Sequence, residues 1–307
     1  MLYLVKDPLY KSIRINSFIE YGFKMVKLEY KEFPDGEAYI RFQDSIDPEG
    51  TYVVLARGFP DQDRNIIRSM LITHTLRDYG AQRIYFCMPY FPYSRQDKRF
   101  LAGEAISAKI IAESIVSNID TLITVDVHNP LAFGYLGAKF IDIRTIDLWS
   151  DLIKKNYGNK KCGLVSPDVG RKSFVAEIAR KCKVPMASFE KRRDLSTGRI
   201  ISHEPEDFDS YKGIIGDCEV IIIIDDIIAT GSTIANISLK LRSDGFKGKI
   251  VVAATHGLLL GNSYDRLVMA GVNEIICSDT VENPFIHRDA LVGPYITRTI
   301  DRLIQSY

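Results

Sequence analysis

Cysteine and long apolar runs are both scarce in this chain. Its five cysteines are an odd number, lie far apart and form no CxxC pair, so we expect reduced, buried thiols and no disulfide framework. The longest purely aliphatic run, Val220–Ile224, falls far short of the roughly 20 apolar residues that a membrane helix needs. Lys6 and Asp7 interrupt the apolar start of the chain, which excludes a signal-peptide core there. We therefore expect a soluble, cytoplasmic protein with no membrane partner.

An excess of charge of either sign is also missing. The 40 basic and 39 acidic residues leave a formal net charge of +1, which gives no bulk electrostatic reason to hold a nucleic acid. Any phosphate chemistry must therefore come from local clusters. The sequence contains neither GxxxxGK(S/T) nor GxGxxG, and it has no HExxH motif or Cys/His cluster. These absences exclude a P-loop, a dinucleotide fingerprint and an evident zinc site.

What is present is globular composition and a strand–helix rhythm. With 307 residues, of which 46% are hydrophobic and 26% charged, the chain has the size of about two domains at roughly 150 residues each. Short β-branched runs alternate with amphipathic segments of helical period, which predicts parallel strands covered on both faces. The two halves resemble two copies of one α/β architecture, each a mainly parallel sheet flanked by helices.

The predicted elements divide at a point that no Pro/Gly/Ser linker marks. We place the boundary near Asp142–Asp147, giving domains 1–145 and 146–307, with a last helix that can pack back on the N-terminal domain. The predicted elements are strands 51–56, 83–88, 121–126, 162–166, 185–189, 220–225 and 249–255, and helices 104–117, 171–181 and 233–243, with a further helical pattern from Ile66 to His74. Outside the rhythm, Met25–Tyr30 and Ala38–Phe42 flank Phe33-Pro34-Asp35-Gly36-Glu37, which predicts a projecting β-hairpin.

The strongest chemical signal follows the strand that begins at Val220. That strand delivers Asp225 and Asp226, and the small-residue loop Ala229-Thr230-Gly231-Ser232-Thr233 then opens a helix. Backbone N–H groups at a helix N-terminus, together with hydroxyl donors, can cradle a monophosphate, and the carboxylates can accept hydrogen bonds from sugar hydroxyls. The alternative is an ordinary helix cap, but a cap does not require two carboxylates four to five residues earlier. We therefore favour a sugar-phosphate site.

The chain resembles the ribose-phosphate diphosphokinases, also called phosphoribosyl pyrophosphate synthetases, which have the type I phosphoribosyltransferase fold. Besides the Asp225–Thr233 loop, four motifs stand in that family's order: Phe33-Pro-Asp-Gly-Glu37, Pro89-Tyr-Phe-Pro-Tyr-Ser-Arg95-Gln96-Asp97-Lys98, Asp126-Val-His128-Asn129-Pro130 and Ser166-Pro-Asp168. The resemblance implies transfer of the diphosphoryl group of Mg-ATP to the 1-hydroxyl of ribose 5-phosphate, giving AMP and 5-phosphoribosyl 1-diphosphate.

The resemblance also assigns the binding residues. ATP would be bound by Phe33, Asp35, Glu37, Arg95, Gln96 and Lys98, and ribose 5-phosphate by Arg193, Asp225, Asp226, Ala229, Thr230, Gly231, Ser232 and Thr233. The planar guanidinium of Arg95 and the amide of Gln96 suit phosphates and base edges. By the residues alone, a rigid aromatic turn with Arg95 in a surface ion pair is an equal alternative.

A magnesium site is expected from residues just past two strands. His128 and Asp168 each follow a predicted strand, with Asp126 beside His128. A carboxylate, an imidazole and waters can form an octahedral site that leaves positions open for ATP phosphates. The other four histidines are expected to be structural.

A basic segment, Phe189–Arg199, is expected to supply the catalytic cations. By the residues alone it could be a solvated charged loop. Phosphoryl transfer, however, is catalysed mainly by positive charge near the reacting oxygens. In the resembling family a Lys-x-Arg pair closes over the phosphates, and we carry that role to Lys191 and Arg193.

Three departures from the family's pattern limit which of the family's properties can be expected of this chain. Ala229 stands where many members have an acidic residue, and Arg171 replaces a second glycine after Pro-Asp-x-Gly. The N-terminus also lacks the Gly-Asn-Ser-like opening of many members, so allosteric control by phosphate and ADP is not carried over to this chain.

The resemblance implies an assembly of dimers. The hairpin tip of that family reaches into the ATP site of a neighbouring subunit, which would make the active enzyme a homo-oligomer, dimer or hexamer. Two other functions stay open from the residues alone. A salvage phosphoribosyltransferase shares the Asp225–Thr233 loop but commonly needs one domain, and a non-catalytic regulatory partner would have no need of Lys191, Arg193, His128 and Asp168.

Overall fold

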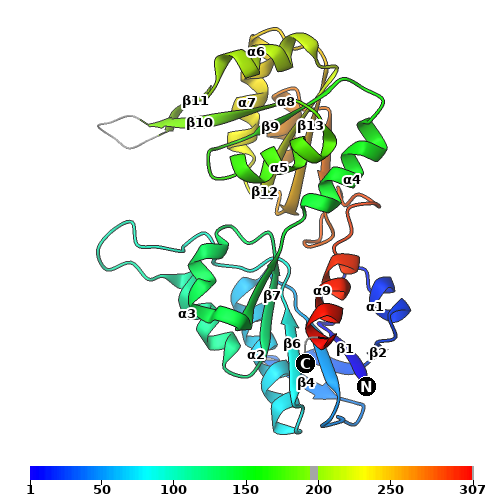
Figure 1. The fold of residues 1–307 in the computed structure, drawn as a ribbon. Coiled ribbons are helices and arrows are strands. Elements are labelled where there is room, and N and C mark those ends of the chain that lie inside the picture. The colour runs from blue at the N-terminus through cyan, green and yellow to red at the C-terminus, as the bar shows by residue number, and fades with distance from the viewer. Residues whose placement is uncertain (194–199, 306–307) are drawn as a thin grey trace. The chain divides into compact units, whose positions relative to one another are not determined.

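The computed structural model describes residues 1–193 and 200–305, with the side chains of 191–202 left out, and it divides into two compact units (Figure 1). Met1–Arg144, Thr280–Glu282 and Leu291–Tyr307 form the first unit, and Thr145–Asp279 and Asn283–Ala290 form the second. The division falls one residue from the predicted boundary at 145/146. The final segment of the chain belongs to the first unit.

The first unit is built on a six-stranded parallel sheet in the order β2-β1-β5-β6-β7-β8. Its elements are β1 (Leu2–Lys6), α1 (Asn16–Glu20), β2 (Lys24–Met25), β3 (Leu28–Glu32), β4 (Ala38–Phe42), β5 (Thr51–Leu55), α2 (Gln62–Asp78), β6 (Arg83–Cys87), α3 (Ser107–Val116), β7 (Thr121–Val125), the 3-10 segment Pro130–Lys139, β8 (Phe140–Ile143) and α9 (Gly293–Gln305). Every residue of β5 and β7 is buried, as expected for strands covered on both faces.

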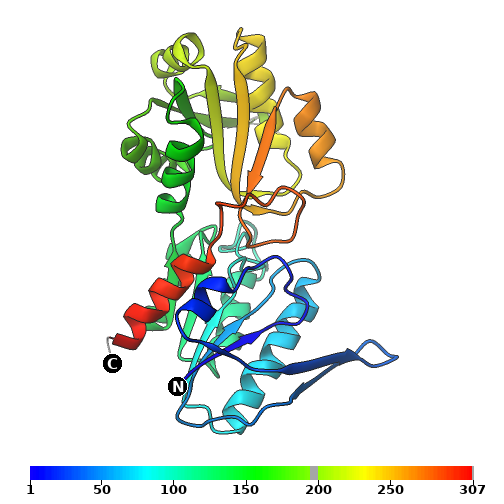
Figure 2. The same cartoon turned by 90° about the vertical axis from the view of Figure 1, so that its right-hand side faces the viewer.

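A two-stranded antiparallel hairpin of β3 and β4 leaves the first unit's sheet (Figure 2). Leu28, Ile40 and Phe42 at its base pack against the apolar core of the unit. The predicted first arm, Met25–Tyr30, was wrong in detail, because Met25 pairs with β1 as part of β2 and the hairpin strand begins at Leu28. Core packing therefore fixes the base of the hairpin, and the tip of the hairpin lies furthest from the sheet (Figure 2).

The second unit has a six-stranded sheet in the order β11-β10-β9-β12-β13-β14, parallel except for the pairing of β10 with β11. Its elements are α4 (Ile146–Tyr157), β9 (Cys162–Ser166), α5 (Lys172–Cys182), β10 (Met186–Arg193), β11 (Ile200–Pro205), α6 (Phe208–Asp217), β12 (Val220–Ile228), α7 (Ser232–Ser243), β13 (Lys249–Gly257), α8 (Ser263–Met269) and β14 (Glu274–Cys277). The expected α/β class with mainly parallel sheets is confirmed.

Two strands run further than their sequence patterns predict. β12 was expected to end at Asp225 but continues to Ile228, because Ile227 and Ile228 keep pairing with β13. β10 was expected to end at Phe189 but continues to Arg193, because β11 pairs with it in antiparallel register. The helix predicted from residue 104 begins at Ser107.

The cysteines agree with the expectation of free thiols, and most of them are buried. All five cysteines are free, and Cys87, Cys162 and Cys277 are buried whereas Cys182 and Cys218 are half-buried. Burial raises the pKa of Cys162 to about 12, which keeps it as a thiol. Across residues 1–193 and 200–305, we find no helix with both the length and the apolar character needed to cross a bilayer.

Candidate active site

The two carboxylates of the phosphate motif lie inside strand β12 and not in the loop after it. Asp226 is 5% exposed, and Asp225 is partly exposed at the neighbouring position. The backbone N–H of Asp226 donates to Asp225 Oδ1 at 2.9 Å, and that of Ile227 donates to Asp226 Oδ1 at 3.0 Å. These local bonds fix both side chains near the carboxyl end of the strand.

Arg171 is the partner of Asp226. Its guanidinium forms an ion pair with the Asp226 carboxylate, and both side chains are largely buried. Burial, together with the charge of Asp226, raises the pKa of Asp225 well above its ordinary value. The sequence marks Arg171 only as a departure from the family's pattern, and its role appears once α5 and β12 are folded together.

Loop 229–231 connects β12 to the N-terminus of α7. Gly231 has a φ of +70°, and a Cβ at this position would lie 3.2 Å from Leu267 Cγ. Only glycine adopts this conformation at little cost, so the loop geometry depends on it. No side chain caps α7, and its first turn contains no acidic residue. The first N–H groups of α7, with the hydroxyls of Thr230, Ser232 and Thr233, can therefore bind an anion.

The other predicted residues of the second unit follow adjacent strands at the same sheet edge. Asp168 lies just past β9, where its Oδ1 accepts from the Arg171 N–H at 3.2 Å. β9 lies between β10 and β12, and the three strands are parallel. The C-terminal ends of β9, β10 and β12 therefore share one edge. Lys191 and Arg193 are placed in the last residues of β10, with Lys191 opposite His203 of β11, but their side chains and residues 194–199 lie outside the described residues.

In the first unit, the predicted nucleotide loop follows β6. Arg95 and Lys98 are exposed, whereas Gln96 is half-buried and donates to the Lys98 carbonyl at 3.2 Å. Asn129 Nδ2 donates to Asp97 Oδ2 at 2.6 Å, which joins this loop to the segment containing His128. Because β6 and β7 are parallel neighbours, the structure brings these two motifs together at one sheet edge.

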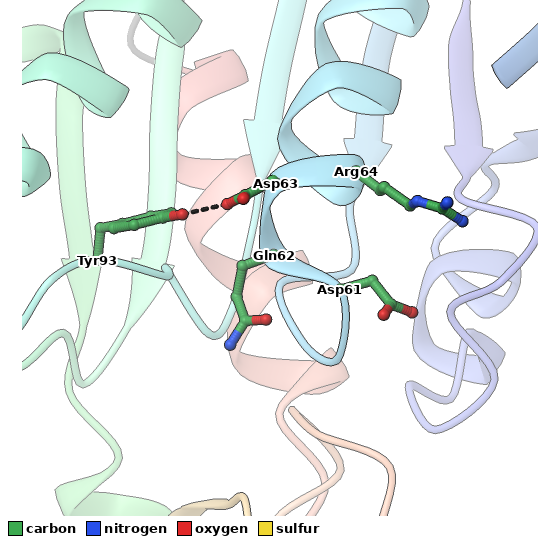
Figure 3. A pocket seen from close by; sticks show the side chains of 5 residues that line it. All are labelled: Asp61, Gln62, Asp63, Arg64 and Tyr93. Atoms are coloured by element: carbon green, nitrogen blue, oxygen red, sulfur yellow. Dashed lines mark hydrogen bonds between the residues drawn. The ribbon is translucent and has the colours of Figure 1, made fainter. Parts of the chain in front are cut away.

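A pocket of about 530 Å³ beside this loop was missed by sequence reasoning (Figure 3). It is lined by Asp61, Gln62, Asp63, Arg64 and Tyr93. The Tyr93 hydroxyl donates to Asp63, and Arg64 pairs with Glu32 at the end of β3 at 3.2 Å. The pocket lining thus links α2 to the Arg95 loop and to the hairpin. Its one sequence signal is the position of Asp61–Arg64 just past a buried strand.

The hairpin tip presents an aromatic ring and carboxylates to the outside. Phe33 is 44% exposed and packs edge-on against Tyr39 within the hairpin. The backbone N–H of Glu37 donates to Asp35 Oδ1 at 3.1 Å, and Gly36 has a φ of +91°. The hydrogen bonds within the turn fix its conformation, and the Phe33 ring stays partly exposed at the tip.

The predicted magnesium ligands differ in accessibility. His128 is exposed and Asp168 is partly exposed, and an imidazole and a carboxylate with open positions suit Mg²⁺ bound to phosphate oxygens. Asp126, the third predicted ligand, is 2% exposed and takes part in an interaction within the fold. In the part of the chain that the structure describes, no three His, Cys, Asp or Glu side chains gather into a ready metal site.

Comparisons with known proteins point in one direction. Residues 9–118 match the model of the N-terminal domain of ribose phosphate pyrophosphokinase. A ribose-phosphate pyrophosphokinase of Methanopyrus kandleri is 31% identical over 280 residues, covering 91% of this chain and 92% of the relative. One of Saccharolobus solfataricus is 35% identical over 258 residues, covering 84% and 85%.

A solved structure agrees over the whole length. The crystal structure of phosphoribosylpyrophosphate synthetase from Mycobacterium smegmatis matches with a TM-score of 0.85 at 26% identity, covering 100% of this chain and 99% of that one. The similarity therefore extends over both units, which include the candidate nucleotide residues of the first unit and the phosphate loop of the second.

Proposed function

The chain belongs to the ribose-phosphate pyrophosphokinase family. On this basis we propose which substrate each of its two units binds. The enzyme transfers the diphosphoryl group of ATP to the 1-hydroxyl of ribose 5-phosphate, giving 5-phosphoribosyl 1-diphosphate and AMP. The first unit binds ATP. The second unit, which consists of Thr145–Asp279 and Asn283–Ala290, binds ribose 5-phosphate.

The phosphate loop of the second unit carries this proposal. Its uncapped α7 N-terminus, the positive φ of Gly231 and three hydroxyls supply donors for the 5-phosphate. Asp225 and Asp226 lie near the end of β12, just before the phosphate loop, and accept hydrogen bonds from the ribose hydroxyls. Ala229 contributes through its backbone alone, since it has no polar side chain.

ATP is held at the edge formed by β6 and β7. Arg95 and Gln96 provide planar donors, and Lys98 adds positive charge. Phe33, Asp35 and Glu37 reach the adenine from the hairpin of a second copy of the chain. The exposed ring of Phe33 supports this part of the proposal, because it is available for stacking. The active enzyme is accordingly a homo-oligomer built on a two-fold pair.

The reaction is an in-line attack of the ribose 1-hydroxyl on the β-phosphorus. Little covalent chemistry is required of the protein, so positioning and charge neutralisation dominate. Lys191 and Arg193 on the extended end of β10 neutralise charge on the transferred group. His128 of the first unit and Asp168 of the second would each offer a ligand to Mg²⁺, which would supply positive charge to the phosphate oxygens. A cytoplasmic location stays a prediction of the sequence.

Product analysis with labelled ATP tests the reaction. Label on the γ-phosphate should appear in the diphosphate of the sugar product, with AMP as the other product. If the label appears in free phosphate, or if ADP is the nucleotide product, the enzyme is an ordinary kinase or hydrolase. Omitting ribose 5-phosphate is the control for spontaneous ATP hydrolysis.

A further inference from the structure

The connection from β13 to α8, together with Arg266 of α8, donates hydrogen bonds to three consecutive backbone carbonyls at the start of the phosphate loop. The N–H groups of Leu258 and Leu259 donate to the Ile228 carbonyl at 2.9 and 3.0 Å, and that of Leu260 donates to the Ala229 carbonyl at 2.9 Å. The next carbonyl, of Thr230, accepts from Arg266 Nη1 at 2.9 Å. Three consecutive carbonyls are therefore occupied from one side.

Arg266 also contacts the hydroxyls of the loop. The same Nη1 atom, which has two N–H hydrogens, donates to Ser232 Oγ at 2.5 Å. Nη2 donates to Asn262 Oδ1 at 3.3 Å, which holds the guanidinium in place. Ser232 Oγ in turn lies 3.1 Å from Thr230 Oγ1, where either hydroxyl can be the donor. Arg266 thus begins a short chain of hydrogen bonds that runs through both hydroxyls.

The direction of that chain is fixed by the chemistry of arginine. A guanidinium can only donate, so Ser232 Oγ must accept from it. Whichever of Ser232 and Thr230 then donates to the other, one hydroxyl hydrogen of the pair is left to point away from Arg266. A hydroxyl that accepts from a cation is also a stronger donor, because successive hydrogen bonds polarise one another. An anion needs donors of this kind.

We propose that Arg266 is a positioning residue for the reaction, which makes the 5-phosphate loop present only hydrogen-bond donors to ribose 5-phosphate. It does so by occupying the Thr230 carbonyl and by orienting the Ser232 and Thr230 hydroxyls. This inference rests on the proposed function of the loop. Leu267, the next residue of α8, lies against Gly231, so α8 sets both the shape and the polarity of the loop.

Calorimetric binding of ribose 5-phosphate to the full-length enzyme tests the proposal. Arg266→Met keeps much of the side-chain volume but removes the donors, and we expect it to weaken binding at least about tenfold, the scale of a hydrogen bond from a charged group. Arg266→Lys should recover most of the loss. The KM for ATP and the melting temperature should stay close to wild type. Arg288→Met, at an 81% exposed side chain in the same unit, is the matched control and should change nothing.

A double-mutant cycle with Ser232→Ala tests the route through the hydroxyl. If Arg266 acts through Ser232, the loss caused by Arg266→Met should be at least about threefold smaller in the Ser232→Ala background. Additive losses, unchanged ribose 5-phosphate binding in Arg266→Met, or a fall in melting temperature with both KM values raised would each overturn the proposal. If Ser232→Ala and Thr230→Val also leave ribose 5-phosphate binding unchanged, the proposed site at this loop fails as well.

Discussion

Asp225 is a partly exposed acid whose ionisation opposes folding. Burial and the neighbouring Asp226 raise its pKa above the ordinary value of 3.8, so the folded state binds the proton more tightly than the unfolded state. The contribution to stability is therefore complete below about pH 4 and is lost as the pH rises through the folded-state pKa.

Asp225→Asn should remove this pH dependence. We expect the variant to gain stability over wild type as the pH is raised from about 4 towards neutrality, since the amide has no proton to lose. Its ribose 5-phosphate binding should weaken, because the carboxylate acceptor is gone. Thermal unfolding at a series of pH values measures the gain, with the exposed Asp217→Asn as control. A stability difference that stays constant with pH would contradict the assignment.

Gly231 offers a second test at a single residue. Gly231→Ala places a Cβ in the left-handed region and 3.2 Å from Leu267, at a cost of about 1–2 kcal/mol. The same change should raise the KM for ribose 5-phosphate, because the loop amides move. Gly245→Ala is the matched control: its φ is +96° but nothing lies within 4 Å of the added Cβ. That control should lose stability and keep the wild-type KM for ribose 5-phosphate. If the two variants have equal KM values, Gly231 has no role in binding ribose 5-phosphate.

The sequence predicts the contiguous part of the site and misses its partners. Asp225 and the 229–233 loop are recognisable because strand, carboxylates and small residues follow one another along the chain. Arg171 and Arg266 lie far away in sequence and contact the motif only through α5 and α8. A side chain of this kind has no local signal, because its role depends on which helix packs beside the loop.

Strand β10 shows why element boundaries are harder to predict than element type. Glu190, Lys191 and Arg192 are charged and unlike a buried strand, so the pattern indicates a loop after Phe189. They extend the strand because β11 returns antiparallel and supplies the backbone partners. Pairing with a later segment outweighed local preference.

Lys191 at the end of this strand should matter for turnover. We expect Lys191→Ala to lower kcat at least about 10²-fold, the scale of losing one transition-state donor, and to leave ATP binding nearly intact. Steady-state kinetics together with equilibrium binding of ATP provide the measurement. Full turnover in the variant would show that Lys191 has no catalytic role.

Helix α9 is held to the first unit by an apolar face and by polar bonds to α1. Ile296 and Ile300 are fully buried, Thr297 Oγ1 donates to Ser17 Oγ at 3.2 Å, and Tyr21 donates to Asp301. Ile300→Ala should therefore destabilise the protein by about 2–5 kcal/mol. Arg302→Ala, on the exposed side of the same helix, should change stability by less than about 0.5 kcal/mol. Denaturant unfolding compares the two, and equal losses would mean that α9 is not anchored by this face.

The whole assembly can be tested by mixing subunits. Subunits with Phe33→Ala and Glu37→Ala are co-assembled with subunits carrying Lys191→Ala. In a mixed two-fold pair with shared sites, one site collects both defects and the other collects none. Equal random mixing should then restore about a quarter of wild-type activity, since about half of the pairs are mixed. Mixed pairs confirmed by mass spectrometry but no more active than either parent would exclude a shared site.

At the scale of the whole chain, the repeated α/β rhythm was predictable because parallel strands buried on both faces leave a continuous apolar signal. The last helix was expected to be able to pack back on the N-terminal domain, but the division of the segments just before it was not predicted. Thr280–Glu282 and Leu291–Tyr307 belong to the first unit, whereas Asn283–Ala290 belongs to the second. No local sequence pattern distinguishes these segments, because they differ only in which unit's core each segment packs against.

This threading has a consequence for synthesis on the ribosome. The first unit lacks α9 until the second unit has been synthesised, so the apolar surfaces that receive Ile296 and Ile300 stay uncovered while the second unit emerges. A premature stop between residue 144 and α9 would release a first unit that exposes this surface. The nascent chain should therefore depend on chaperone protection late in translation, and the two units cannot be separated by a single proteolytic cut.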